Sequence, residues 1–370
     1  MKNYRAIGLM SGTSMDGVDL ALIESNGENY LKVIDSYYLE YNLSFKHKLS
    51  NLINNKQDLI FIKSVEQELT NIHIQTVNQF LNKKNIKASD IDIIGFHGHT
   101  IFHNSQQAIT WQIGNSFQLA INCQIDVVSD FRTKDLILGG QGAPLVPIYH
   151  FHLLKNSPKI SQQNIGILNI GGVSNLSFFN KNDENSLIGF DVCFGNAVFD
   201  DLVKQQLNKD FDKDGRLTSL GKVNVEVALN ILQKEIFNRP IPRSFDRQDF
   251  FDVLKPLEIL NLEDRLATYS FILANALKIA LQQLPNQPQI ILICGGGRKN
   301  HGILSQIVKT LPEISVANID DFGFNGDSIE AEAFAFLAIR SLQNQAISFK
   351  NTTGLKNRQS ACGGVLYRKD

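Results

Sequence analysis

Two segments of this chain share one pattern, and that repeat limits the fold more than any other feature. Residues 6–24, AIGLMSGTSMDGVDLALIE, read as an apolar strand, a polar glycine-containing turn and a second apolar strand. Residues 164–180, NIGILNIGGVSNLSFFN, follow the same order. A further strand is predicted after each hairpin, at 30–41 and at 187–191. The chain is therefore predicted to hold two copies of one mixed α/β unit.

Helices and strands alternate after each hairpin. In the first copy, a capping-box pattern at Ser64 and Gln67 predicts the start of a helix. The other elements predicted there are a helix from 44, strands at 91–95 and 126–128 and a helix at 117–122. The second copy is predicted to have strands at 289–294 and 314–316 and helices from 196, at 223–237, at 266–283, from 300 and at 326–342. Antiparallel hairpins followed by right-handed crossovers predict a mixed sheet in each copy.

The chain of 370 residues is long enough for two domains. We expect the first domain over 1–134 and the second over 135–344. Residues 208–262, rich in charge and proline, read as an insertion on the second copy. The tail, 345–370, is expected to return to the first domain. Two copies of one unit are expected to enclose a cleft, with one glycine turn on each wall.

Composition excludes several classes of partner. The formal net charge of -1 gives no electrostatic footprint for nucleic acid or an anionic membrane. The first apolar run breaks at Ser11, too early for a signal-peptide core, and no apolar stretch is long enough to span a bilayer. The four cysteines lack C-x-x-C spacing and read as reduced thiols, at Cys123, Cys193, Cys294 and Cys362. We therefore expect a cytoplasmic protein that binds neither nucleic acid nor membrane.

The turn of the first hairpin is suited to phosphate binding. Residues 11–17 hold two glycines, three hydroxyls and a carboxylate. Glycine lets the backbone approach a ligand closely, and bare N–H groups and hydroxyls donate to phosphate oxygens. Asp16 can hold a divalent cation through water. The alternative is a solvated hairpin loop.

Two more glycine turns follow strands of the second copy. Gly171 and Gly172 lie in its hairpin, and Gly295 to Gly297 follow the strand at 289–294. Backbone of this kind can lie against a base or ribose at the ligand edge of an α/β sheet, or can simply lead into a helix. The sequence contains no G-x-x-x-x-G-K-[ST] string, and no G-x-G-x-x-G follows a strand, which disfavours P-loop and dinucleotide-binding folds.

Two carboxylates and two histidine pairs are candidates for chemistry. Asp191, between a strand and a helix, can act as a general base or merely cap the helix. Glu330, one turn inside the last helix, can reach a ligand or complement the helix dipole. The pairs His97/His99 and His150/His152 raise a rival reading, a metal-dependent hydrolase that uses His97 and His99.

A basic pair and a glycine turn follow the strand at 126–128. Arg132 and Lys134 can bind an acidic substrate group or remain surface charges. Gln141 lies in the glycine-rich turn that comes next and suggests a tight connection between the domains.

Seven strings together indicate a family. In chain order they are GLMSGTSMDGVD, HG-x-T, DFR-x-x-D, LGGQGAPLVP, LNIGG-x-x-NLS, CGGG-x-x-N and GD-x-x-EA. In these strings the chain resembles the anhydro-N-acetylmuramic acid kinases, within the sugar kinase, Hsp70 and actin superfamily, over essentially its whole length. The resemblance implies duplicated RNase H-like (actin-like ATPase) domains with a cleft between them.

The resemblance also implies a reaction and its site. ATP would phosphorylate 1,6-anhydro-N-acetylmuramic acid while its internal ether is hydrolysed, giving N-acetylmuramic acid 6-phosphate in peptidoglycan recycling. Asp191 matches the general base. The implied sugar-binding residues are His97, Arg132, Gln141, Asn196 and Glu330. The implied ATP-binding residues are Gly12, Thr13, Ser14, Met15, Asp16, Gly17, Val18, Asp19, Gly171, Gly172, Asn175, Gly295, Gly296, Gly297 and Asn300. Mg²⁺ would enter with ATP, and a homodimer is implied.

The chain departs from the family at two places on the sugar side. Val192-Cys193-Phe194 replaces a usual Thr-Gly-Pro, and Ser244-Phe245-Asp246-Arg247 replaces a Ser-Thr-Gly-Arg-like run. A kinase of a related sugar is therefore an alternative. A non-catalytic nucleotide-binding switch is a third reading, which no peptide-binding or polymerisation segment supports.

Overall fold

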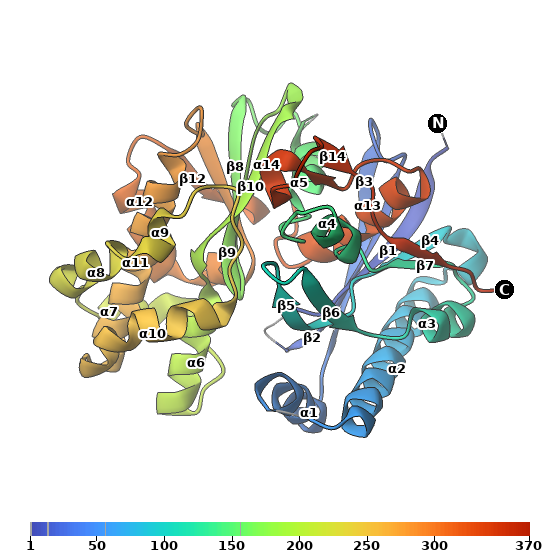
Figure 1. Cartoon of the computed structure of the whole chain (residues 1–370), viewed down its shortest axis with the longest axis horizontal. Coiled ribbons are helices and arrows are strands. Elements are labelled where there is room, and N and C mark those ends of the chain that lie inside the picture. Colours follow the sequence, from blue (N-terminus) through green and yellow to red (C-terminus); the bar gives the residue numbers. More distant parts are fainter. Residues whose placement is uncertain (1, 13–14, 56, 156) are drawn as a thin grey trace. The chain divides into compact units, whose positions relative to one another are not determined.

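The computed structural model describes residues 2–12, 15–55, 57–155 and 157–370. The chain forms two compact units, each with its own sheet and core (Figure 1). Unit 1 comprises Met1–Leu153 and Ser328–Asp370, and unit 2 comprises Leu154–Asp327. Every helix among these residues is too short or too polar to cross a lipid bilayer.

The sheet of unit 1 is mixed. Strands β1 (Tyr4–Met10), β2 (Gly17–Ser25) and β3 (Leu31–Glu40) form an antiparallel meander. On the other side of β1, strands β4 (Ile93–Phe96) and β7 (Val127–Ser129) continue in parallel. The C-terminal strand β15 (Val365–Tyr367) closes the order β15-β7-β4-β1-β2-β3.

The sheet of unit 2 repeats this topology. Strands β8 (Asn164–Ile170), β9 (Val173–Asn180) and β10 (Asp183–Phe194) form the antiparallel meander. Strands β11 (Ile290–Cys294) and β12 (Ser315–Asn318) continue in parallel from β8. The order β10-β9-β8-β11-β12 matches β3-β2-β1-β4-β7 strand by strand. The predicted duplication of an RNase H-like unit is therefore confirmed.

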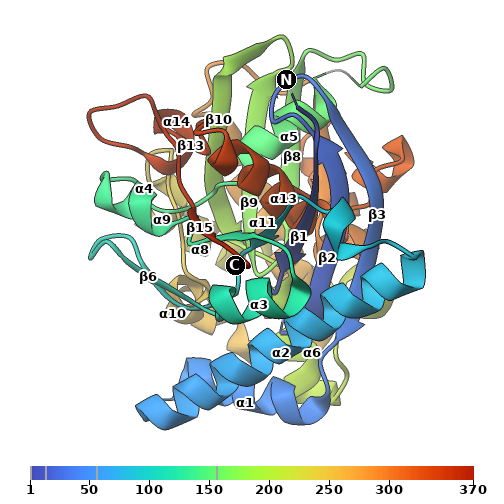
Figure 2. The ribbon, with the colours of Figure 1, turned by 90° about the vertical axis from the view of Figure 1, so that its right-hand side faces the viewer.

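The α-helices that belong with the first sheet are α1 (Leu43–Asn54), α2 (Leu59–Lys84), α3 (Ser116–Cys123), α4 (Thr133–Ile137), α5 (Pro147–Leu154), α13 (Ile329–Leu342) and α14 (Lys350–Thr353). The long blue helix in Figure 2 is α2. The capping box predicted at Ser64 is wrong. Asp58 caps α2 by accepting from the Phe61 N–H, so Ser64 lies inside a helix that has already begun and donates to the Phe61 carbonyl.

Helix α13 packs against β1, β2 and β4, so the expectation that the last helix completes the second copy is wrong. The physical reason lies in paired glycines. Gly8 on β1 and Gly95 on β4 are register partners. A Cβ on Gly8 would collide with the Ala331 carbonyl, and one on Gly95 would collide with the Phe334 carbonyl. Two adjacent glycines thus let the alanine-rich helix approach the sheet closely.

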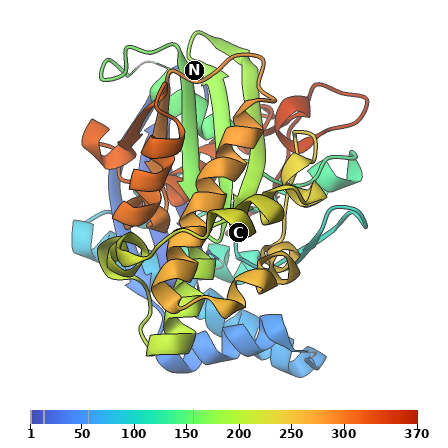
Figure 3. The ribbon, with the colours of Figure 1, turned by 90° about the vertical axis from the view of Figure 1, so that its left-hand side faces the viewer.

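Unit 2 carries helices α6 (Asn196–Leu207), α7 (Arg216–Leu220), α8 (Val225–Leu232), α9 (Glu235–Asn238), α10 (Phe251–Leu254), α11 (Leu262–Leu281) and α12 (His301–Thr310). The long orange helix α11 lies in front of the green strands in Figure 3. Its apolar face belongs to one buried cluster that also includes residues of α6 and of the 208–262 segment. Tyr269 of α11, Phe250 of the 208–262 segment and Phe194 of β10 are members of this cluster. The segment expected as an insertion therefore contributes to the core of unit 2.

The limits of the units differ from the expected domains. The first segment of unit 1 continues past residue 134 to Leu153, and its second segment begins at Ser328. The 345–370 tail lies in unit 1, where β15 extends the sheet beside β7. Two hairpins were not foreseen, because their strands are short and partly polar. They are β5 (His99–Asn104) with β6 (Ile109–Ile113), and β13 (Ser348–Phe349) with β14 (Ser360–Ala361).

Candidate active site

The turn between β1 and β2 carries the first set of predicted nucleotide residues. Met15 has a φ of 58° and donates its N–H to the Gly12 carbonyl over 3.0 Å. Asp16 is exposed. Gly17 has no room for a Cβ, because the Leu39 carbonyl occupies that position. Thr13 and Ser14 lie outside the described residues.

Val18 and Asp19 lie within β2 rather than in the turn. The Val18 side chain is fully buried in the core of unit 1, so it is not accessible to a ligand. Asp19 is half-buried and is the register partner of Met10 and Tyr38.

Tyr41 connects the two flanks of this turn. Its hydroxyl lies 2.7 Å from Ser11 Oγ, and its backbone N–H donates to the Asp16 carbonyl over 2.9 Å. Ser11 Oγ also lies 2.8 Å from His99 Nδ1. All three side chains are buried, and burial lowers the pKa of His99 to about 4. His99 is therefore neutral near pH 7 and supports Ser11 through a hydrogen bond.

His97 holds Arg132 in place. Arg132 Nε and Nη2 lie 3.1 and 3.0 Å from His97 Nε2, and Arg132 Nη1 donates to the Gly142 carbonyl over 2.7 Å. His97 Nδ1 lies 3.0 Å from the Gly98 carbonyl, which assigns the proton to Nδ1 and leaves Nε2 as the acceptor. Burial first, and then the Arg132 charge, hold the pKa of His97 well below its ordinary value.

This arrangement does not favour the metal hydrolase. The acceptor nitrogen of His97 is taken by Arg132, and His99 Nδ1 is taken by Ser11. Across the described ranges, no group of three or more His, Cys, Asp and Glu side chains is placed to hold a metal ion. His152 lies in α5, and its Nδ1 contacts the Glu28 carbonyl.

A pocket of about 230 Å³ opens beside His97 in unit 1. Trp111 and Tyr367 supply aromatic surface, and hydroxyl, amide and carboxylate groups supply hydrogen-bonding partners. The polar side chains of its lining are His97, Thr110, Gln112, Ser116, Ser129, Asp130 and Thr133. Aromatic surface combined with convergent polar groups suits a sugar.

Gln141 and Glu330 both lie in unit 1, Gln141 near the end of its first chain segment and Glu330 near the start of its second. The Gln141 N–H donates to the Thr353 carbonyl over 2.7 Å, which ties the glycine-rich turn to α14. Glu330 is half-buried in the first turn of α13. Two residues on, the buried Glu332 accepts from Ser328 Oγ over 2.5 Å and from the Tyr149 hydroxyl, which anchors the start of this helix.

In unit 2, the carboxyl ends of the parallel strands β8 and β11 bring two glycine turns to one edge. Asn169 lies between them: a Cβ on Gly295, whose φ is +76°, would collide with its Oδ1. A Cβ on Gly171 would lie 3.7 Å from the nearest neighbouring atom, Asn169 Nδ2. A Cβ on Gly296 would be 3.7 Å from Asn196 Nδ2. The backbone at Gly171 and Gly296 is therefore accessible to a ligand, as phosphate or adenosine contact requires.

Gly172 and Gly297 have structural roles at this edge of the sheet. The Gly172 carbonyl accepts from the Gly195 N–H over 3.1 Å, which joins the β8–β9 turn to the start of α6. Gly297 is buried, and the Ile170 side chain occupies the space that a Cβ would need.

Asp191 lies in a polar row that crosses three strands. Asn175 on β9 is the register partner of both Asn169 on β8 and Asp191 on β10. Directly opposed residues of antiparallel strands share a face, so these three side chains are neighbours. Asp191 is 7% exposed, and its Oδ2 accepts from the Phe245 N–H over 2.8 Å. The buried Arg243 donates from Nε to the Asp191 carbonyl over 3.0 Å.

The helix-cap reading of Asp191 is wrong. Strand β10 continues through Asp191 to Phe194, and Gly195 occupies the N-cap position of α6. The register of β10 shifts between Asp191 and Cys193, which marks a bulge. Bulges re-aim side chains next to active sites. Asn196 follows at the first position of α6 and donates to Asp200 over 2.7 Å.

The departures from the family pattern are largely core residues. Val192, Cys193 and Phe194 are each fully buried in the cluster of unit 2. The Phe245 ring packs edge-on against Phe250 at 5.3 Å, while its backbone contacts Asp191. Both replaced strings thus lie next to Asp191, the predicted base: Val192–Phe194 follow it on β10, and Phe245 contacts its carboxylate.

Asn300 has a structural role. It is 5% exposed, and its Oδ1 accepts from the Ile303 N–H over 3.1 Å, which caps α12. Its Nδ2 donates to Thr218 Oγ1 over 3.4 Å. Nucleotide contact by this side chain therefore stays a prediction, because its amide is engaged within unit 2.

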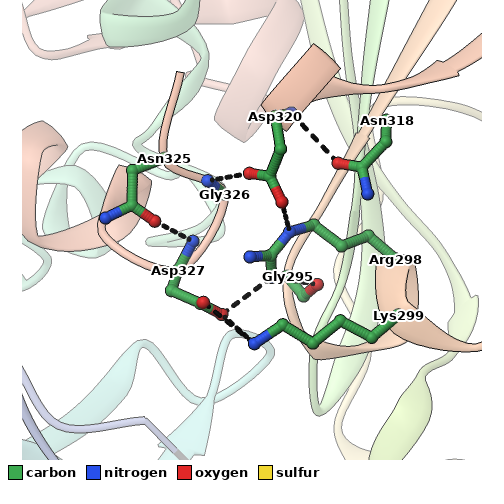
Figure 4. A network of polar contacts seen from close by, with 8 residues as sticks. All are labelled: Gly295, Arg298, Lys299, Asn318, Asp320, Asn325, Gly326 and Asp327. Atoms are coloured by element: carbon green, nitrogen blue, oxygen red, sulfur yellow. Dashed lines mark hydrogen bonds and ion pairs between the residues drawn. The ribbon is translucent and has the colours of Figure 1, made fainter. Parts of the chain in front are cut away.

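The turn at Gly295–Gly297 is joined to a network of charged residues (Figure 4). Arg298 is 3% exposed and donates from Nε to Asp320 and from Nη1 to Asp327, over 2.8 and 2.7 Å. Lys299 contacts Asp327 over 2.9 Å. Hydrogen bonding to Arg298 lowers the pKa of Asp327 to about 2, so this carboxylate remains charged through the neutral range.

Comparison with known proteins decides the family. The family model for anhydro-N-acetylmuramic acid kinase matches residues 4–369. The chain belongs to the anhydro-N-acetylmuramic acid kinase family. It is 36% identical to the anhydro-N-acetylmuramic acid kinase of Rhizorhabdus wittichii, covering 100% of both chains. It is 38% identical to that of Zymomonas mobilis, covering 98% of this chain and 99% of the relative. Members of this family transfer a phosphoryl group.

Two solved structures show weaker likeness. An activator of 2-hydroxyisocaproyl-CoA dehydratase from Clostridium difficile, with bound ADPNP, is 13% identical, with a TM-score of 0.45 over 92% of this chain and 96% of its own. A ROK family glucokinase from Streptomyces griseus is 10% identical, with a TM-score of 0.42 over 90% and 99%. The fold assignment rests on the strand order of the kinase itself.

Sequence reasoning missed several residues of this site. Asn169 interrupts an apolar strand, a signal that a search for buried polar residues would have found. Tyr41, Arg243 and Arg298 gave no such signal, because each acts through partners far away in the sequence.

Proposed function

We propose that this chain is an ATP-dependent kinase that opens the internal ether of 1,6-anhydro-N-acetylmuramic acid and phosphorylates O6. The product is N-acetylmuramic acid 6-phosphate. Family membership over residues 4–369 supports the sugar and the phosphoryl transfer. The single observation that carries the proposal is the buried Asp191 carboxylate, which lies in register with Asn175 on the hairpin whose turn exposes Gly171.

The proposed reaction couples two bond changes. Asp191 takes a proton from water, and the water oxygen attacks the anomeric carbon C1. The C1–O6 bond breaks, and O6 forms a bond to the γ-phosphorus of ATP as ADP leaves. The Phe245 N–H, which donates to Oδ2, orients the carboxylate for this proton transfer.

ATP is proposed to bind through backbone groups. The accessible backbone at Gly171 and Gly296 fits phosphate and adenosine, because glycine allows close approach, and Gly12 brings the same residue type to the first turn. Mg²⁺ neutralises charge on the transferred phosphate when it is bound. Asp16, exposed in the first turn, fits a water-mediated contact to that ion, and the ATP phosphates would supply its other ligands.

The sugar is proposed to bind in unit 1 through Arg132, Glu330 and the pocket beside His97. Arg132 is oriented by the neutral His97 and by the Gly142 carbonyl, so its guanidinium is held in a defined direction. Trp111 offers a face on which a pyranose ring can pack.

Isotope labelling tests the coupled reaction. The purified protein, ATP, Mg²⁺ and the anhydro sugar are incubated in ¹⁸O-labelled water, and the product is analysed by mass spectrometry. We expect one labelled oxygen on C1 and none on the transferred phosphate. Label in the phosphate would indicate plain ATP hydrolysis and contradict the proposal.

A related sugar is the second candidate, favoured by the replaced Val192-Cys193-Phe194 string. These residues are buried, so their effect on specificity would pass through the position of Asp191 and Phe245. A panel of anhydro and free amino sugars distinguishes the candidates. Faster phosphorylation of a sugar without the 1,6-ether would favour the second.

We also propose a cytoplasmic homodimer that acts in cell-wall recycling. All four cysteines are free thiols, three of them buried, which suits a reducing compartment. Cell fractionation and analytical ultracentrifugation test these two points independently of the activity.

A further inference from the structure

The glycine turn after β11 runs into a short 3₁₀ helix, Gly296–Lys299, and few backbone hydrogen bonds fix its shape: the Arg298 and Asn300 N–H groups donate to the Gly295 and Gly297 carbonyls over 3.2 and 3.0 Å. Gly295 to Gly297 carry no side chains, and glycine loses more conformational freedom on ordering than any other residue. Gly295 has φ +76° and ψ 175°, a backbone conformation that other residues rarely adopt. A side chain that also binds this turn would restrict it further to the one conformation that it presents to a nucleotide.

Arg298 is placed to supply that restraint. Its Nη1 donates to the Gly295 carbonyl over 3.1 Å and to Asp327 over 2.7 Å, while its Nε donates to Asp320 over 2.8 Å. Asp320 in turn accepts from the Gly326 N–H over 2.7 Å. One buried guanidinium thus joins the glycine turn to the segment that holds Asp320 and Asp327, as Figure 4 shows.

The backbone closes the same ring. The Gly295 N–H donates to the Gly326 carbonyl over 3.3 Å. A Cβ on Gly326 would meet Arg298 Nε, so the absence of a side chain there lets the guanidinium sit between Asp320 and Asp327. The cation is 3% exposed, whereas the side chains of the two carboxylates are 40% and 51% exposed. Losing the cation therefore leaves carboxylates that water can solvate, and the fold is expected to survive.

We infer that Arg298 is a positioning residue that holds the Gly295–Gly297 turn in the conformation that receives the nucleotide. This inference rests on the proposed function and deepens it, because it assigns the nucleotide surface of unit 2 to a side chain outside the glycine string. The effect is preorganisation: a ligand that meets an ordered turn does not have to order it on binding.

The test measures binding of ADP alone, without sugar, by isothermal titration calorimetry. Arg298→Met is expected to raise the Kd for ADP by roughly 10- to 100-fold, the range expected when hydrogen bonds to a charged group are lost. At saturating ATP, kcat and the sugar KM should stay near wild type. Asp320→Asn, which weakens only one of the contacts, is expected to raise the Kd less.

Lys299→Met is the matched control. It removes a positive charge from the same Asp327, but the Lys299 side chain is 60% exposed. Its Kd for ADP should stay within about twofold of wild type if geometry rather than net charge matters. Unchanged ADP binding by a folded Arg298→Met protein would overturn the inference and leave the proposed function standing. A wild-type protein that binds no ADP would overturn both.

If Arg298→Met does not fold, Asp320→Asn decides the matter. A rise in its Kd for ADP, with thermal stability near wild type, supports the positioning role. An unchanged Kd contradicts it.

Discussion

At the scale of single residues, neutral groups in this site act by holding charged ones. The buried His97 keeps its proton on Nδ1 and offers Nε2 to Arg132. The Phe245 N–H holds one oxygen of Asp191. Each such contact fixes a side chain whose direction decides what it can do to a ligand, and removing it should change kinetics more than folding.

Asp191→Asn is expected to lower kcat by about 10² to 10⁴, the usual contribution of a general base. Stability should be retained, because Asn can still accept from the Phe245 N–H and because Gly195 occupies the N-cap position of α6. Steady-state kinetics and thermal unfolding measure the two effects. Near-native kcat would remove Asp191 from the mechanism.

Asp212→Asn is the control for this substitution. Asp212 is another buried carboxylate of unit 2 and accepts from Thr218 and Leu217 in a loop. Its loss should lower stability by about 1 to 3 kcal/mol, with kcat of the folded enzyme near wild type.

Tyr41→Phe tests the restraint on the first turn. The substitution removes only the hydroxyl that contacts Ser11, while the N–H that holds Asp16 remains. The KM for ATP should rise about 2- to 10-fold, the worth of one net hydrogen bond, with a smaller change in kcat. Tyr37→Phe on β3, whose hydroxyl donates to the exposed Gln79, should leave the KM unchanged. Equal KM values in both variants would contradict a role for Tyr41.

At the scale of elements, glycines serve two different purposes. Gly8 and Gly95 make room for α13 on the sheet of unit 1, whereas Gly171 and Gly296 leave backbone accessible at the ligand edge of unit 2. The residue type is the same, and only the neighbouring atoms distinguish packing from binding.

The two purposes predict opposite phenotypes for one substitution. Gly8→Ala should lower the free energy of unfolding by about 1 to 3 kcal/mol, because its methyl group would overpack against Ala331. Gly296→Ala should change stability by less than about 0.5 kcal/mol, because its methyl group would make only an ordinary van der Waals contact, 3.7 Å from Asn196 Nδ2. It should nevertheless weaken ADP binding. Chemical denaturation and calorimetry measure both quantities. A Gly296→Ala protein with full ADP affinity would place the nucleotide elsewhere.

At the scale of the whole molecule, the interior of unit 1 holds several neutral histidines. Burial lowers the pKa of His73 and His99 to about 4 and that of His150 to about 3, and His97 lies well below its ordinary value. The unfolded chain would bind protons at these groups near pH 6.5, where the folded chain does not. Between pH 6.5 and 4 the unfolded state therefore binds more protons, and stability falls as the pH falls.

The free energy of unfolding is accordingly expected to decrease between pH 7 and 5, with each histidine contributing up to about 1.4 kcal/mol per pH unit. Glu332 acts in the opposite direction, because burial raises its pKa. Thermal unfolding across this range measures the slope. His73→Leu removes one titrating group and should make the slope shallower. A stability that is flat from pH 7 to 5 would contradict the assignment of neutral buried histidines.

The sequence alone determined the duplicated strand order and the family, because alternating apolar runs, glycine turns and short motifs are local signals. It also singled out Asp191 as the candidate base, which stays a prediction. Tertiary structure decided the rest. The last helix joins unit 1 because Gly8 and Gly95, distant in sequence, become neighbours on β1 and β4. Asp191 proved not to be a helix cap because β10 runs past it. The ring around Arg298 joins residues up to 32 positions apart, Gly295 to Asp327. Such contacts depend on chain path, which no local pattern encodes.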